Sequence, residues 1–167
     1  LDTNGSVSGI LDQLSFEPAD RGDLVVRSDG TLFFVTRADR PLGHPVVEHP
    51  GSLAVYKLED NRLQHRGSLT DADLMHGDLV FRGANEITLS PDGREVFMAA
   101  VFADDETGEV AVIQRAAIDN RSRPWPLPPL GTESAQPEIV AMKFNTAGDR
   151  LLLSDWNEIR LYRRVPK

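Results

Sequence analysis

The sequence predicts an all-β fold, and three observations support this prediction. Apolar and polar residues alternate with a period of two along most of the 167-residue chain, as in half-buried strands. Turns that contain glycine separate these apolar runs. No segment longer than a turn has helical periodicity, apart from Ser68–Met75, which we consider a candidate helix.

One sequence unit occurs three times, with copies about 50 to 60 residues apart. Each copy has a short apolar strand, a turn with glycine and a second apolar strand. Regular arrays of such sheet units are typical of β-propellers. The copies are Asp23–Val35, Asn85–Ala99 and Glu138–Ser154, and their turn glycines are Gly30, Gly93 and Gly148.

We therefore expect one partial β-propeller domain over residues 1–167, with about three four-stranded blades. The blades are expected at about residues 16–68, 78–130 and 137–167, and residues 1–15 as an outer strand or linker. Four prolines surround Trp125 and place that segment at an outer edge, because proline cannot donate to a sheet ladder. The third unit ends after three strands. Closed propellers need about four blades or more, so a second chain or a missing N-terminal half is expected to complete the ring.

The composition argues against nucleic-acid and membrane partners and against cysteine chemistry. The net charge is −8 and no Lys/Arg run is present, so no nucleic-acid partner is expected. The absence of cysteine excludes disulfides, thiolate catalysis and zinc–thiolate sites. No apolar run approaches the roughly 20 residues of a membrane span, so no membrane partner is expected. These features leave the compartment open, since both cytoplasmic and exported proteins are compatible with them.

Several stretches resemble, in order and spacing, the blade motifs of the SMP-30/gluconolactonase family. They are Asp23–Phe34, Gly51–Leu58, Asn85–Phe97 and Pro137–Ile139. The resemblance covers residues 20–164, about half of the family fold. It implies a six-bladed ring, Ca²⁺ or another divalent cation on its axis, and lactone or ester substrates.

The same resemblance implies metal ligands at Asn85 and Glu138, where Glu replaces the aspartate of the family. Amide and carboxylate oxygens suit a hard cation such as Ca²⁺. Gly22 stands where the family has a further amide ligand, and Ala99-Ala100 stand at a usual aspartate position. The catalytic match is therefore weaker than the fold match, and no residue is assigned as catalytic.

Three further residues are expected to contact a substrate or partner. Asp23 lies before a first strand, and His44 lies in the Arg37–Pro50 loop, which covers the active-site mouth in the family. Trp156 lies at a turn where many propellers have glycine. A strand-starting aspartate, a surface histidine and a packing tryptophan remain the alternative interpretations.

Two functions follow as hypotheses. The first is a metal-dependent hydrolase of lactones or esters, in which Ca²⁺ polarises the carbonyl and activates water. The alternative is a catalytically eroded propeller that binds a protein or ligand, because a fold does not fix a function. A WD40-like scaffold ranks last, on the resemblance of Ser154–Tyr162 to the end of such a repeat.

Overall fold

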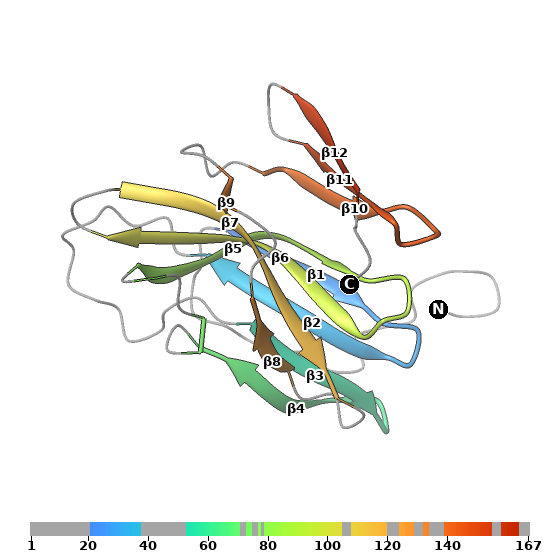
Figure 1. The fold of residues 1–167 in the computed structure, drawn as a ribbon. Coiled ribbons are helices and arrows are strands. Elements are labelled where there is room, and N and C mark those ends of the chain that lie inside the picture. Colours follow the sequence, from blue (N-terminus) through green and yellow to red (C-terminus); the bar gives the residue numbers. More distant parts are fainter. Residues whose placement is uncertain are drawn as a thin grey trace.

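The described part of the chain is all-β (Figure 1). This computed structural model describes residues 21–37, 53–70, 73–74, 77, 79–104, 108–119, 124–128, 132–133, 139–154 and 158–163. They form twelve strands and no helix. Consequently, none of the described residues belongs to a helix that could cross a membrane. The all-β prediction is confirmed.

Blade 1 is an antiparallel meander of four strands, in which each strand pairs with the next along the chain. The turn between its third and fourth strands is Asp60-Asn61, where both residues have positive φ (51° and 60°). Asp and Asn tolerate this conformation, which matches the twist of a hairpin. The strands are β1 (Arg21–Val26), β2 (Thr31–Arg37), β3 (Leu53–Glu59) and β4 (Arg62–Leu69).

Blade 2 repeats this meander, with a short fifth strand beside its third. Its Pro-Trp-Pro strand pairs only with β7 among the described residues, so the predicted edge position of Trp125 is confirmed. The strands are β5 (Val80–Leu89), β6 (Glu95–Asp104), β7 (Gly108–Ile118), β8 (Pro124–Leu127) and β9 (Thr132–Glu133).

Blade 3 has three described strands, which pair in chain order. They are β10 (Ala141–Phe144), β11 (Arg150–Ser154) and β12 (Ile159–Arg163). Blade 3 forms a sheet of its own, whereas blades 1 and 2 are joined by the single pair Arg37 and Gly83.

The expected helix at Ser68–Met75 is wrong over its described residues. Ser68 and Leu69 belong to β4, and a turn follows in which the Leu74 N–H donates to the Thr70 carbonyl. The Asp73 carboxylate accepts from both the backbone N–H and the hydroxyl of Thr70, at 2.9 and 2.8 Å. Asp73 and Leu74, the next described residues, lie in a turn and a bend rather than in a helix.

The blades pack face to face through two apolar clusters. In the first, Phe33 and Val35 of blade 1 contact the side of blade 2 that carries Met98. In the second, Phe97 on the other side of blade 2 packs in a cluster with Met142 of blade 3. Phe33 and Phe97 are 0% and 1% exposed, and burying such a side chain contributes about 1.5–3 kcal/mol.

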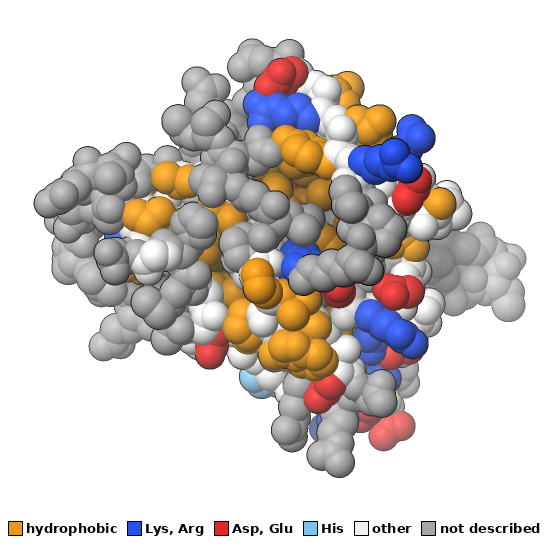
Figure 2. Space-filling view, viewed as in Figure 1, with side chains coloured by type: hydrophobic (Ala, Val, Ile, Leu, Met, Phe, Trp, Pro, Cys, Tyr) orange, Lys and Arg blue, Asp and Glu red, His pale blue; other side chains and the backbone are white. Residues whose placement is uncertain are grey.

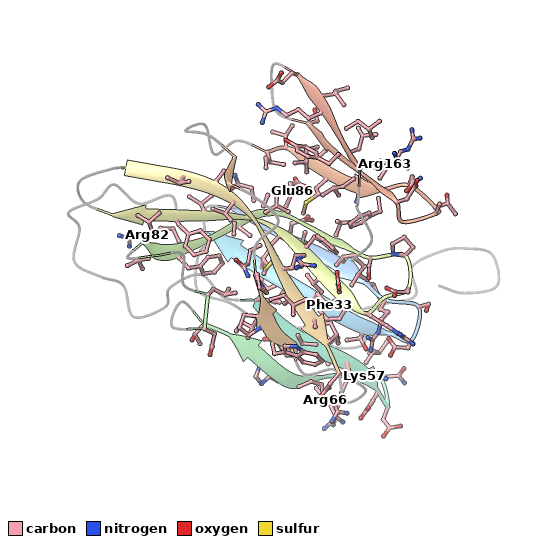
Figure 3. The ribbon with its side chains drawn as sticks, viewed as in Figure 1. Phe33, Lys57, Arg66, Arg82, Glu86 and Arg163 are labelled. Carbon is pink, nitrogen blue, oxygen red and sulfur yellow. The ribbon has the colours of Figure 1, made fainter. Side chains whose placement is uncertain are left out.

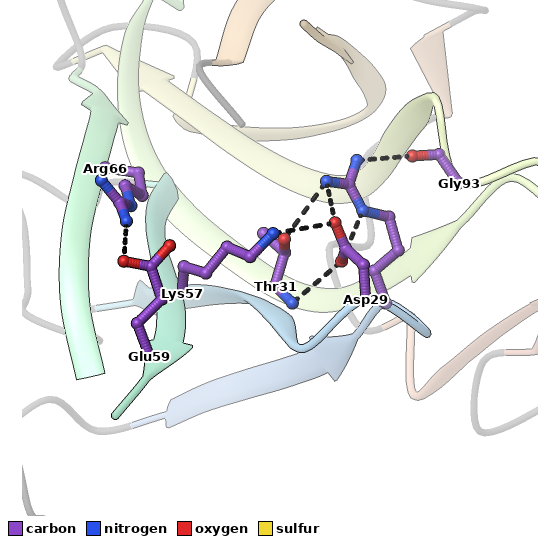
Figure 4. Close-up of polar contacts among 7 residues, drawn as sticks. Asp29, Thr31, Lys57, Glu59, Arg66 and Gly93 are labelled. Carbon is purple, nitrogen blue, oxygen red and sulfur yellow. Dashed lines mark hydrogen bonds and ion pairs between the residues drawn. The ribbon is translucent and has the colours of Figure 1, made fainter. Parts of the chain in front are cut away.

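The three predicted turns are equivalent. In each, the glycine has positive φ and its N–H donates to the carbonyl three residues earlier, at 2.8–3.0 Å. The turn of blade 1 also reaches blade 2, because the Arg27 guanidinium donates to the Gly93 carbonyl at 3.2 Å (Figure 4). Hydrogen bonds from Arg27 hold the Asp29 carboxylate and keep the pKa of Asp29 well below its usual value. The turn of blade 3 lies against Pro91 in the turn of blade 2.

Two glycine substitutions separate backbone strain from this contact between blades. Gly30 and Gly93 have φ of +82° and +67°. Backbone strain at such a φ lowers the free energy of unfolding of an alanine variant by about 1–2 kcal/mol at either position. A Cβ at Gly30 meets nothing within 4 Å, whereas one at Gly93 lies 2.9 Å from Cδ of Arg27. We expect Gly93→Ala to lower the free energy of unfolding by about 1 kcal/mol more than Gly30→Ala in urea titrations. Equal losses would mean that Arg27 moves aside without cost.

Candidate functional site

Charged side chains on the first strands of the three blades interact electrostatically, with Glu86 as their common partner. Asp23 is on β1, Glu86 on β5 and Lys143 on β10. Strand β5 is in contact with both β1 and β10. Figure 3 shows Glu86 between β10 and the strands of blades 1 and 2. We call Asp23, Glu86 and Lys143, with the adjacent Asn85, the three-blade cluster.

A β-bulge in β5 positions two of these residues. The pairing of β5 with β6 shifts between Ala84 and Ile87, so Asn85 and Glu86 lie in the bulge. A bulge re-aims the side chains of its strand and is common beside functional sites. Asn85 was expected to open the first strand of blade 2, but β5 begins at Val80 and places Asn85 mid-strand, 8% exposed.

Asp23 links blade 1 to this bulge. One carboxylate oxygen accepts a hydrogen bond from the Leu24 N–H at 2.8 Å. The other accepts from the Ile87 N–H across the blade boundary, at 3.0 Å. Both carboxylate oxygens are therefore fixed by backbone donors, one from each blade. Asp23 was expected before the first strand of blade 1, but β1 begins at Arg21 and contains Asp23. Its contact with a substrate or partner stays a prediction.

The surroundings of Glu86 favour its neutral form. Burial raises the pKa of Glu86 from 4.5 to about 7, and the negative charge of Asp23 and a hydrogen bond with the Asp23 carboxyl act in the same direction. The Lys143 ammonium lowers this pKa, but its effect is outweighed. Asp23 and Glu86 therefore form a carboxyl pair that holds a proton near neutral pH.

Sequence reasoning missed Glu86, although the repeat contains the signal. Asp23 and Glu86 each stand seven residues before the glycine of their turn, Gly30 and Gly93. The same position in blade 3 is Ala141, so the repeat places a carboxyl group in blades 1 and 2 only. Aligning the copies on their glycines, rather than on the first polar residue, would have brought the two acids together.

Three of the predicted site residues lie outside the described part of the chain. They are Glu138, His44 and Trp156. The expected pairing of Asn85 with Glu138 on one metal ion therefore stays a prediction. Among the described residues, no group of three or more His, Cys, Asp or Glu side chains could hold a metal.

A cavity of about 470 Å³ lies between the glycine-containing turns of blades 1 and 2, next to Gly93. Its charged lining is largely engaged, since Arg27 holds Asp29 and the Ser90 hydroxyl donates to Asp92 at 2.6 Å. We assign the cavity no site and keep the three-blade cluster as the candidate.

Comparison with known proteins supports the fold. No family model matches the chain, and no curated protein matches its sequence. A solved structure from Bacteroides fragilis, of a protein provisionally assigned as a 6-phosphogluconolactonase, has a TM-score of 0.57 and 16% identity. The match covers 86% of this chain and 34% of that chain. A Lactobacillus plantarum protein matches with a TM-score of 0.35 and 14% identity, over 86% of this chain and 50% of that one.

The first of these likenesses shows the fold alone, because the identity is low, and the β-propeller prediction is confirmed. This chain spans about a third of the length of that protein. The comparisons do not single out the SMP-30/gluconolactonase family, so that resemblance and the six-bladed ring it implies stay predictions.

The raised pKa of Glu86 predicts a pH-dependent stability. The unfolded chain releases this proton near pH 4.5, whereas the folded protein holds it until about pH 7. The stabilising contribution is therefore complete below pH 4.5 and is lost as the pH rises through 7. We expect the urea midpoint to fall between pH 5 and pH 8, and to fall less in Glu86→Gln. The exposed Glu158→Gln serves as control, and an unchanged pH profile in Glu86→Gln would contradict the assignment.

Proposed function

We propose that this chain carries part of the active site of a β-propeller hydrolase that acts on lactones or esters with the help of a divalent cation. The observation that supports it is the three-blade cluster, in which two carboxyl groups from neighbouring blades meet at a bulge next to an amide side chain. Burying two like charges together is unfavourable unless a proton or a cation lies between them. Without a bound cation, the proton on Glu86 reduces the repulsion between the two carboxyl groups. We propose that a bound cation takes the place of this proton.

The donor chemistry fits a hard cation such as Ca²⁺. Asp23, Glu86 and Asn85 offer only oxygen ligands, which Ca²⁺ prefers. Ca²⁺ takes about six to eight oxygens, so these three side chains account for part of a site. Glu138, at the start of blade 3, is the further ligand that we propose. A cation held there supplies Lewis-acid polarisation of the substrate carbonyl and makes a nearby water more acidic.

The protein groups have distinct proposed roles. We propose that Asp23 is a rigid metal ligand, because its two carboxylate oxygens accept hydrogen bonds from backbone N–H groups of two blades. Asn85 and Glu86 both lie in the bulge of β5, and we propose that Lys143, whose charge acts on Glu86, offers a positive charge to the carboxylate product. Addition of water to the carbonyl and cleavage of its bond to the ring or ester oxygen give a carboxylic acid, which ionises, and an alcohol.

The catalytically eroded binding module is the second candidate. The absence of a complete His, Cys, Asp or Glu ligand group among the described residues favours it. In that case the Asp23–Glu86 pair only fastens blade 1 to blade 2. His44 and Trp156 are then the first contact positions to test.

Calcium titration separates the two functions. We expect the wild-type protein to bind Ca²⁺ in isothermal titration calorimetry, and Asp23→Asn and Glu86→Gln each to weaken the Kd by about tenfold or more. Glu158→Gln is the matched control, because this exposed carboxylate directly precedes β12, outside the cluster, and we expect the variant to bind Ca²⁺ like wild type.

Hydrolysis of an aliphatic lactone and of phenyl acetate provides the second measurement. We expect activity in wild-type protein that an excess of chelator removes and added Ca²⁺ restores. Hydrolysis that persists in excess chelator would exclude the metal-dependent mechanism. A protein that neither binds Ca²⁺ nor hydrolyses either compound would establish the binding module as the better explanation.

A further inference from the structure

Arg82 differs from the other partly buried arginines in the described part of the chain. Each of the others pairs with a carboxylate, which offsets the cost of burying a charge. These paired residues are Arg27, Arg66, Arg115 and Arg160. No described residue offers a carboxylate to Arg82, and its Nε is buried without a hydrogen-bond acceptor among them. A buried donor without an acceptor is rare, and it indicates a group whose partner comes from elsewhere.

Carboxylates are not scarce in this protein. Asp and Glu outnumber Lys and Arg by 26 to 18 in the sequence. The space-filling view also shows the blue Lys and Arg side chains with red Asp and Glu side chains close by in several places (Figure 2). The lack of a carboxylate at Arg82 among the described residues is therefore a specific property of this position.

A second β-bulge in β5 positions Arg82. The pairing of β5 with β6 shifts between Phe81 and Gly83, so Arg82 is an extra residue without a direct partner in β6. Gly83 pairs with Arg37, the last residue of β2, so this bulge lies where blades 1 and 2 join. The two bulges of β5 thus each contain a charged residue, Arg82 in one and Glu86 in the other. Bulges interrupt the hydrogen-bond ladder and re-aim side chains, and they are common beside functional sites.

Arg82 and the three-blade cluster lie on the same strand. Figure 3 shows Arg82 near one end of the sheet and Glu86 further along. Four residues separate them on β5, so their Cα atoms are no more than about 13 Å apart. The long arginine side chain can span part of this distance. A small molecule that reaches the cluster can therefore also reach the guanidinium.

We propose that Arg82 binds an oxyanion group, a carboxylate or a phosphate, and that this group belongs to the substrate. The planar guanidinium carries a positive charge and offers parallel N–H donors, which match the two oxygens of such a group. The second part of the proposal rests on the proposed hydrolase function. In that function Arg82 holds the anionic end of a lactone or ester while its carbonyl lies at the three-blade cluster.

Thermal unfolding with simple anions tests the oxyanion site without reference to hydrolysis. We expect inorganic phosphate, glutarate or both to raise the Tm of the 167-residue chain above its value in sodium chloride of equal ionic strength. The reason is that a ligand of the folded state alone stabilises that state. Arg82→Gln should lose this rise. Arg62→Gln is the matched control, because Arg62 is exposed at the start of β4, and it should keep the rise.

The result has a definite reading in each case. The anion that gives the larger rise identifies the preferred group. No rise in wild-type protein, or an equal rise in Arg82→Gln, overturns the oxyanion site. If circular dichroism shows that Arg82→Gln is not folded, Arg82→Lys replaces it. Lysine keeps the charge and loses the planar fork, so a rise equal to that of wild type in this variant also overturns the site.

Two esters test whether the anion belongs to the substrate. Phenyl acetate and para-acetoxybenzoate share the acetyl ester, and only the second carries a carboxylate. We expect Arg82→Gln to raise the ratio of the KM for para-acetoxybenzoate to the KM for phenyl acetate by about tenfold or more, because a charge-assisted hydrogen bond is lost. An unchanged ratio overturns the substrate role. If neither ester is hydrolysed while the anion-dependent rise in Tm remains, the hydrolase proposal fails and the oxyanion site at Arg82 stands.

Discussion

A sheet that is apolar on both faces must be covered on both sides, and the rest of this structure depends on that constraint. Blade 2 satisfies it, because Met98 on one face and Phe97 on the other are both fully buried. Successive residues of one strand therefore belong to two different clusters, since side chains alternate across a sheet. Stacking in chain order follows, because each blade can bury its faces only against its neighbours.

The same stacking explains how polar groups come to lie between blades. The first strands converge, so Asp23 reaches the backbone of the bulge in blade 2 and its carboxyl meets that of Glu86. Where the glycine-containing turns of blades 1 and 2 lie side by side, the Arg27 guanidinium donates a hydrogen bond to the Gly93 carbonyl. Polar contacts at both ends of the blade boundary fix the angle between blades 1 and 2, which apolar packing alone leaves adjustable. The raised pKa of Glu86 is a consequence of this convergence.

The position of the three-blade cluster limits how much of the proposed site this chain supplies. A site formed by the first strands of a propeller draws its side chains from every blade, so three blades can supply only part of it.

The sequence by itself determined the local structure. Alternation and the glycines at positions 30, 93 and 148 predicted the strands and the equivalent turns, because both depend on neighbouring residues and on φ. It could not exclude a helix at Ser68–Met75, where Ser68 and Leu69 instead extend the strand β4, which pairs with β3. Only the tertiary structure decided that Asn85 lies in a bulge and that Glu86 meets Asp23. Asp23 and Glu86 are more than 60 positions apart, and their contact depends on how blades 1 and 2 pack rather than on either sequence segment.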